Sequence, residues 1–142
     1  MKRLATNKSV YHGTVSIYKN EILSQGINPT DGGQGDGAYT TTDYQEAVKY
    51  AMDRSCALVS YRGDNPHKTY PIVIECFVDS KNCQQAFNGK WNISQNGIPV
   101  DNIISVIDLD SSPKWIKLIE LYEKDPQSNE FNEYAYTLMN VL

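Results

Sequence analysis

The sequence has few of the residues that disulfide frameworks and metal sites require. It contains three cysteines and two histidines among 142 residues. Cys56, Cys76 and Cys83 are odd in number and show neither a Cys-x-x-Cys pair nor the spacing of zinc ligands, which predicts reduced thiols. Because histidines are scarce and do not cluster with cysteine, aspartate or glutamate, we also expect no metal.

Long apolar runs and an excess of positive charge are missing as well. No stretch approaches the ~20 apolar residues of a membrane-spanning helix, and no apolar leader segment is recognisable. The net charge of −4 argues against a protein that holds nucleic acid mainly by neutralising phosphates. We therefore expect a protein without membrane contact, in the cytoplasm or delivered into the cytoplasm of a host cell.

Hydrophobic and charged residues are present in ordinary proportions, 40% and 21%, so the chain can bury a core. Periodicity predicts short strands interspersed with helices, which indicates one α+β domain over residues 1–142. The longest apolar strand, residues 70–79, is expected to be central. The other predicted strands cover residues 9–13, 38–41, 90–94 and 103–109; helices cover 15–24, 44–54, 115–124 and 129–142; 28–37 is a loop; and 56–61 is a strand or irregular.

Three short motifs follow one another in the first third of the chain. They are Tyr11-His12-Gly13-Thr14, then Gly35-Asp36-Gly37-Ala38-Tyr39 at a strand start, then the helical segment Ala47-Val48-Lys49-Tyr50. In this order and at these spacings, they resemble the NAD-binding half of the ADP-ribosyltransferases of the diphtheria-toxin and poly(ADP-ribose) polymerase kind. The resemblance covers residues 9–51 well and the remainder in outline.

The resemblance implies a fold of two small packed antiparallel or mixed sheets with flanking helices, and NAD as co-substrate without a metal. By this match His12 binds a ribose hydroxyl on the adenosine side, and the backbone of Gly13 binds the nicotinamide carboxamide. Tyr39 and Tyr50 enclose the positively charged nicotinamide ring, an arrangement that cation–π attraction favours. Ala47 stands where many relatives have a serine. Thr40, Thr41 and Thr42 are candidates to replace its hydroxyl. The predicted NAD-binding residues are His12, Gly13, Thr14, Tyr39, Thr40, Tyr50 and Gln95.

A late-strand glutamate that the polymerising relatives carry is not evident in this chain. Counting back from residues 102–107 places its counterpart at Asn92, with Gln95 as the next candidate. An amide can bind a ribose hydroxyl but cannot act as a general base. The predicted catalytic residues are therefore His12, Tyr39 and Asn92, with Glu133 and Glu75 as weaker carboxylate candidates.

The predicted function is mono-ADP-ribosyl transfer from NAD to a macromolecular acceptor, either protein or nucleic acid. A stand-alone domain of this size suggests a bacterial or phage toxin or effector, with an antitoxin or immunity protein as a further partner. Two alternatives stay open. One is an NAD-dependent RNA 2′-phosphotransferase-like enzyme, and the other is a non-catalytic module that binds NAD or ADP-ribose.

Overall fold

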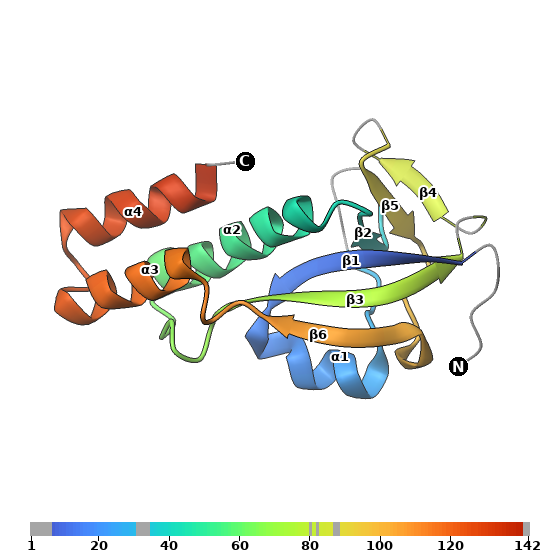
Figure 1. Cartoon of the computed structure of the whole chain (residues 1–142), viewed down its shortest axis with the longest axis horizontal. Coiled ribbons are helices and arrows are strands. Elements are labelled where there is room, and N and C mark those ends of the chain that lie inside the picture. Colours follow the sequence, from blue (N-terminus) through green and yellow to red (C-terminus); the bar gives the residue numbers. More distant parts are fainter. Residues whose placement is uncertain (1–6, 31–34, 80, 82, 87–88, 141–142) are drawn as a thin grey trace.

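The computed structural model of the chain describes residues 7–30, 35–79, 81, 83–86 and 89–140. These residues form two antiparallel three-stranded sheets and four α-helices (Figure 1). The predicted α+β class with two small sheets is thereby confirmed. Part of the predicted loop at 28–37, namely residues 31–34, lies outside the described residues.

The first sheet consists of β1 (Asn7–Val15), β3 (Pro71–Asp79) and β6 (Ile103–Asp108), in the order β1-β3-β6. β3 is central, as its near-continuous apolar sequence predicts, because both of its faces are covered. Ile72, Val73 and Ile74 have no exposed surface. The pairing register between β3 and β6 shifts between Glu75 and Cys76, so the two strands are paired with a β-bulge at this point.

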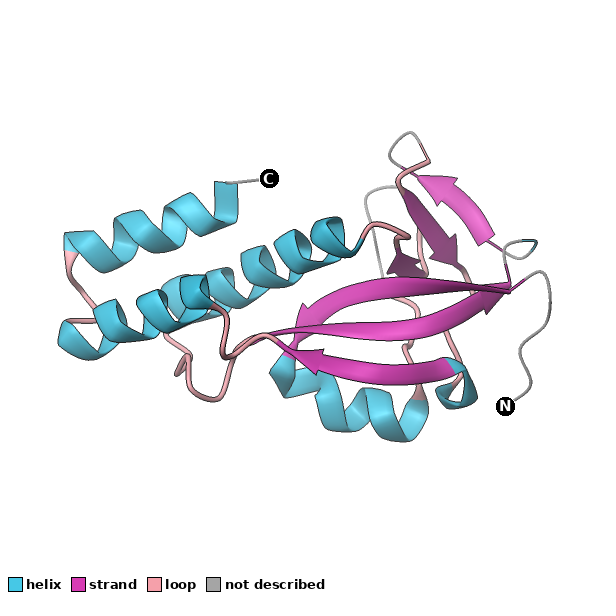
Figure 2. Cartoon of the chain, in the orientation of Figure 1, coloured by secondary structure: helices cyan, strands magenta, loops and turns pink. Residues whose placement is uncertain are grey.

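The second sheet consists of β2 (Ala38–Thr40), β4 (Cys83–Ala86) and β5 (Trp91–Ser94), with β5 in the middle. It meets the first sheet where Tyr11 of β1 pairs with Thr41, just after β2. Figure 2 shows this sheet at one end of β1 and β3, with most of the helical structure gathered at the other end. Beyond Tyr11, β1 has no paired strand on its outer side among the described residues, which leaves room for a site.

Two helices flank β1. A short 3₁₀ helix, Ser16–Tyr18, leads into α1 (Lys19–Gln25), which ends at Gly26 with φ of 82°. The second helix, α2 (Tyr44–Arg62), begins at Asp43, whose carboxylate accepts the backbone N–H of Gln45 at 2.9 Å. α2 is longer than predicted: residues 56–61, expected as a strand or irregular segment, continue the helix. That prediction was wrong.

The C-terminal helices α3 (Pro113–Lys124) and α4 (Asn129–Asn140) pack on α2. Their shared core contains Met52, Cys56 and Val59 of α2 and the fully buried Trp115, whose indole Nε1–H donates to the Pro66 carbonyl at 3.1 Å. A separate core lies beneath the first sheet, between β1, β3 and α1. None of the helices in the described part of the chain is long and apolar enough to cross a membrane.

Two buried hydroxyls carry a first prediction. Thr40 Oγ1 and Ser55 Oγ are buried and have no hydrogen-bond partner among the described residues. An unpartnered buried hydroxyl loses its hydration without compensation. We expect Thr40→Val and Ser55→Ala each to raise the free energy of unfolding in urea, by up to about 1 kcal/mol.

The control is Thr41→Val, because Thr41 Oγ1 accepts the backbone N–H of Asp43 at 3.1 Å. Loss of this bond is expected to lower the free energy of unfolding by about 1 kcal/mol. A Thr40→Val variant as unstable as Thr41→Val would mean that the Thr40 hydroxyl has a partner after all.

Candidate functional site

A cleft of about 380 Å³ opens along the outer edge of β1, between α1 and α2. Residues of all three sequence motifs line this cleft. β1 contributes His12, Gly13 and Thr14, the start of β2 contributes Ala38, and α2 contributes Tyr50. The described residues that line it are His12, Gly13, Thr14, Tyr18, Glu21, Ile22, Gly26, Ile27, Asn28, Thr30, Ala38, Tyr50 and Arg54.

The backbone of Gly13 faces this cleft. In a strand, the N–H and C=O groups of successive residues point to alternate sides. Tyr11 directs both groups away from β3, because they bond Thr41 at 2.8 and 2.9 Å. Gly13, two residues later, directs its groups to the same side, where β2 has already diverged. Among the described residues no backbone group pairs with them there, so one donor and one acceptor open into the cleft.

Gly13 is also required by the packing of α2. A Cβ atom on this residue would collide with the carbonyl oxygen of Ala47 and lie 3.1 Å from the backbone nitrogen of Ala51. The resemblance implied only that the backbone of Gly13 binds a ligand. The structure adds that α2 itself approaches the strand and needs the missing Cβ. Ala47, which stands where many members of the resembled family have a serine, is fully buried and does not line the cleft.

His12 is held as a neutral acceptor. Its Nδ1 lies 2.7 Å from the carbonyl oxygen of Tyr39. A carbonyl can only accept, so Nδ1 carries the proton, and the neutral ring presents Nε2 as an acceptor. Burial lowers the pKa of His12, and the bond to Tyr39 opposes this only in part. At neutral pH the ring is therefore uncharged and oriented by β2.

The two predicted tyrosines lie differently with respect to the cleft. Tyr50 lines it, has 42% of its surface exposed, and its ring centroid is 5.7 Å from that of Trp91. Tyr39 is not among the lining residues. Its carbonyl orients His12 and its hydroxyl donates to the carbonyl of Gly35. The structure therefore gives Tyr39 a positioning contact, and it adds Trp91, which the sequence did not single out, beside Tyr50.

Two charged residues in the cleft are absent from the predicted set. Arg54 follows Tyr50 by one helical turn, so the i, i+4 spacing on α2 was a usable signal for it. Glu21 lies on α1, and one of its carboxylate oxygens accepts from the Asn28 amide at 3.3 Å. Nothing in the sequence pattern marks Glu21. It is the one carboxylate among the described residues that line the cleft.

Several predicted residues lie elsewhere. Asn92 is in the middle of β5, opposite Thr40 of β2, and Thr40 is fully buried. Glu75 accepts from the Ser9 and Ser105 hydroxyls, at 2.9 and 3.1 Å. Glu133 is exposed on α4. Of the predicted site residues, the structure brings His12, Gly13, Thr14 and Tyr50 into one cleft and leaves these others outside it.

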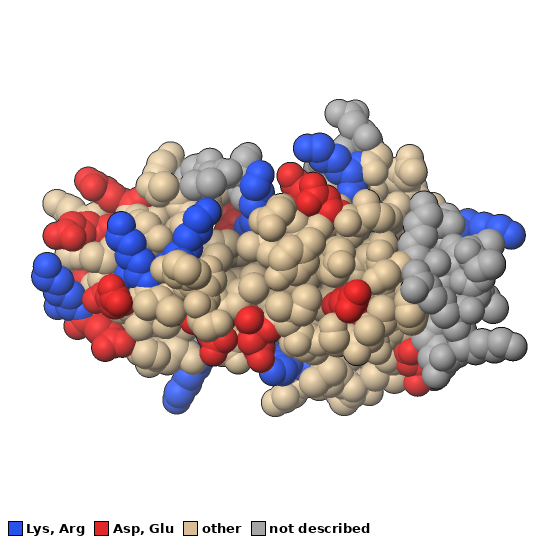
Figure 3. All heavy atoms as spheres, in the orientation of Figure 1, with Lys and Arg blue, Asp and Glu red and all other residues tan. Residues whose placement is uncertain are grey.

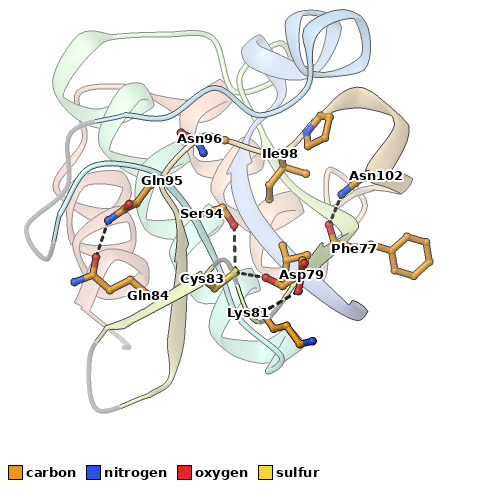
Figure 4. Close-up of a pocket in the computed structure, with 13 residues that line it drawn as sticks. Phe77, Asp79, Lys81, Cys83, Gln84, Ser94, Gln95, Asn96, Ile98 and Asn102 are labelled. Carbon is orange, nitrogen blue, oxygen red and sulfur yellow. Dashed lines mark hydrogen bonds between the residues drawn. The ribbon is translucent and has the colours of Figure 1, made fainter. Parts of the chain in front are cut away.

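Gln95 lies at a second, larger cavity of about 820 Å³. Figure 4 shows that its polar lining groups largely bond one another: Gln95 donates to Gln84 at 3.0 Å, Asn102 to the Phe77 carbonyl at 3.1 Å, and Cys83 Sγ to the Asp79 carbonyl at 3.4 Å. Because these groups are engaged, we assign no ligand to this cavity.

The buried cysteines do not offer a nucleophile. Burial raises the pKa of both Cys56 and Cys76 to about 12, so both are thiols at neutral pH. No group of three or more histidine, cysteine, aspartate or glutamate side chains that could hold a metal ion occurs in the part of the chain that the structure describes.

Comparison of the sequence with protein-family models and with curated proteins gives no match.

Proposed function

We propose that this protein transfers a single ADP-ribose unit from NAD to a macromolecular acceptor. The observation that carries the proposal is the open backbone edge at Gly13. A primary carboxamide presents one acceptor and two donors, so it can bond the N–H and the C=O of a single strand residue together. An edge of this kind beside the exposed ring of Tyr50 suits the nicotinamide half of NAD.

The other parts of NAD have counterparts of suitable chemistry. The ring of Tyr50 can lie against the positively charged pyridinium. Arg54, on the same face of α2, can bond the pyrophosphate, since its guanidinium matches phosphate oxygens. Nε2 of His12 can accept a ribose hydroxyl. Each group comes from an element fixed by packing, and this preorganisation is what a bound, oriented substrate requires.

The reaction breaks the bond between the pyridinium nitrogen and the ribose C1′. The bonding electrons pass to nicotinamide, which leaves neutral, while the ribose becomes oxocarbenium-like. The acceptor's nucleophilic atom then bonds C1′, and its proton passes to solvent water. Asn92 and Gln95 lie outside the cleft, and an amide cannot remove that proton. We therefore propose mono-transfer to an acceptor that is already nucleophilic, rather than chain elongation.

The RNA 2′-phosphotransferase alternative needs a cluster of cations to hold RNA. Arg54 lines the cleft, but Arg62 is paired with Asp64 at 2.9 Å, and the overall charge is −4. On the face drawn in Figure 3, lysine and arginine alternate with aspartate and glutamate over the helical end, without a continuous basic strip among the described residues. On this face the described residues do not form the cation cluster that the phosphotransferase alternative requires.

The test is incubation with NAD labelled in its adenosine half, in a cell lysate, with free nicotinamide and labelled macromolecules measured separately. We compare wild type, Tyr50→Ala and Tyr61→Ala. Tyr61 lies on the same helix with 77% of its surface exposed and does not line the cleft. Loss of a cation–π contact is expected to lower nicotinamide release by roughly 10- to 30-fold in Tyr50→Ala. Tyr61→Ala should match wild type.

Three other outcomes would change the assignment. Binding of NAD without nicotinamide release would favour the non-catalytic module. A labelled product that carries a phosphate taken from RNA would favour the phosphotransferase. Equal activity of Tyr50→Ala and Tyr61→Ala would remove the cleft from the mechanism. Label found in protein or in nucleic acid identifies the class of acceptor.

A further inference from the structure

The two faces of β1 present different chemistry to the cleft. His12 and Thr14 are opposite Ile74 and Ile72 of β3, and these isoleucines belong to the core that includes Ile22 of α1. Their side chains therefore lie on the α1 face of the sheet. Gly13 contacts α2 on the other face. Figure 1 shows α1 and α2 on different sides of β1. The cleft accordingly has an α1 side, with His12 and Glu21, and an α2 side, with Tyr50 and Arg54.

The α1 side presents acceptors. His12 offers Nε2, because Nδ1 donates to Tyr39. Glu21 offers a carboxylate, of which Oε1 accepts from Asn28 at 3.3 Å while Oε2 has no partner among the described residues. The bond to Asn28, which also lines the cleft, restrains the carboxylate relative to the loop after α1. A ligand group bound here is expected to supply hydrogen-bond donors and no negative charge.

A ribose 2′,3′-diol meets this requirement, because its two hydroxyls can donate to two acceptors. A 2′-phosphate does not, because at neutral pH it carries no proton suited to both acceptors and its charge repels a carboxylate. In another class of dinucleotide-binding protein, an acidic side chain at the ribose 2′-hydroxyl accompanies a preference for NAD, whereas an arginine accommodates the 2′-phosphate of NADP. In both cases a carboxylate accepts hydrogen bonds from the ribose hydroxyls and repels a 2′-phosphate.

We infer that Glu21 and His12 together bind the adenosine-side ribose diol, and that Glu21 makes the site selective for NAD against NADP. This inference rests on the proposed function, since it takes the ligand to be an adenine dinucleotide. It assigns Glu21 a role in specificity and none in breaking the nicotinamide bond. NAD and NADP have the same nicotinamide half, which is proposed to lie on the α2 side at Gly13 and Tyr50. Discrimination between them must therefore come from the adenosine side.

The experiment measures binding of ADP-ribose and of 2′-phospho-ADP-ribose by calorimetry to wild type, Glu21→Gln and Glu120→Gln. Both probes lack nicotinamide, so binding is measured without chemistry. Glu120→Gln removes the same charge from an exposed position on α3, outside the cleft. Wild type and Glu120→Gln are expected to prefer ADP-ribose by about tenfold or more, and Glu21→Gln should reduce that preference by about tenfold.

The same variants are then assayed with NAD and NADP. Glu21→Gln should change the ratio of the KM values for NAD and NADP, whereas Glu120→Gln, outside the cleft, should leave kcat and both KM values near those of wild type. An unchanged preference in Glu21→Gln, or a wild type that binds both probes equally, would overturn the role of Glu21 while leaving the proposed function standing. Failure of both probes and of NAD to bind would overturn the proposed function, and this inference with it.

Discussion

Gly13→Ala is expected to destabilise the protein by about 3 kcal/mol, the upper range for forcing extra volume into a packed site. The added Cβ would collide with the carbonyl oxygen of Ala47, which belongs to the backbone of α2 and cannot rotate away. Either α2 lifts off β1 or the strand shifts. Because Tyr50 and Arg54 are carried by the same helix, NAD binding should weaken together with stability.

Urea unfolding monitored by circular dichroism measures this effect, and Gly63→Ala is the matched control. A Cβ at Gly63 would meet no atom within 4 Å, but its φ of 76° is unfavourable for alanine. The free energy of unfolding of that variant should decrease by about 1 kcal/mol through backbone strain alone. Ala47→Gly should not rescue Gly13→Ala, because the collision is with the main chain. A stable Gly13→Ala protein, or rescue by Ala47→Gly, would show that α2 does not press on Gly13.

The fold could be predicted where local pattern and burial agree. The apolar run of residues 70–79 predicted a central strand, and the helix predicted from residue 44 does begin at Tyr44. The end of α2 could not be read in the same way, because Cys56 and Val59 lie in a stretch whose composition suits a strand. What decides their conformation is the α3–α4 pair, which covers Cys56 and Val59 at helical spacing, and that contact is made by residues at the far end of the chain.

The candidate site likewise could be predicted only where its residues are close in the sequence or lie on neighbouring elements. His12, Gly13 and Thr14 are consecutive on one strand and Tyr50 is on the next long element, so their meeting needs only the packing of α2 on β1. Asn92 was chosen by counting back along the chain from β6. β5 instead pairs with β2 and β4, so that count did not lead to the cleft. Glu21 could not be found from the sequence, because an acidic residue on a short exposed helix carries no distinguishing pattern.

His12 should make both stability and ligand binding depend on pH. Its pKa is lowered from 6.5 in the folded protein, chiefly by burial. Below about pH 6.5 the unfolded chain takes up a proton at this position, and the folded chain does so only at lower pH. The contribution of His12 to the free energy of unfolding is therefore fully present above about pH 6.5. It decreases as the pH falls below this value, by at most about 1.4 kcal/mol per pH unit for one proton. His12→Gln should not show this part of the decrease.

Urea unfolding at intervals from about pH 8 to pH 5 tests this, with His67→Gln as control, because His67 is exposed and bonds Glu123 at 2.7 Å. ADP-ribose binding should weaken over the same range, since protonation converts Nε2 from an acceptor into a donor that no longer suits a ribose hydroxyl. In His12→Gln, binding should be weaker at every pH, by about tenfold for one lost hydrogen bond, and should lack the histidine-dependent decline. If His12→Gln and wild type decline in parallel, the titrating group is not His12, and the ring does not act as the neutral acceptor that its bond to Tyr39 indicates.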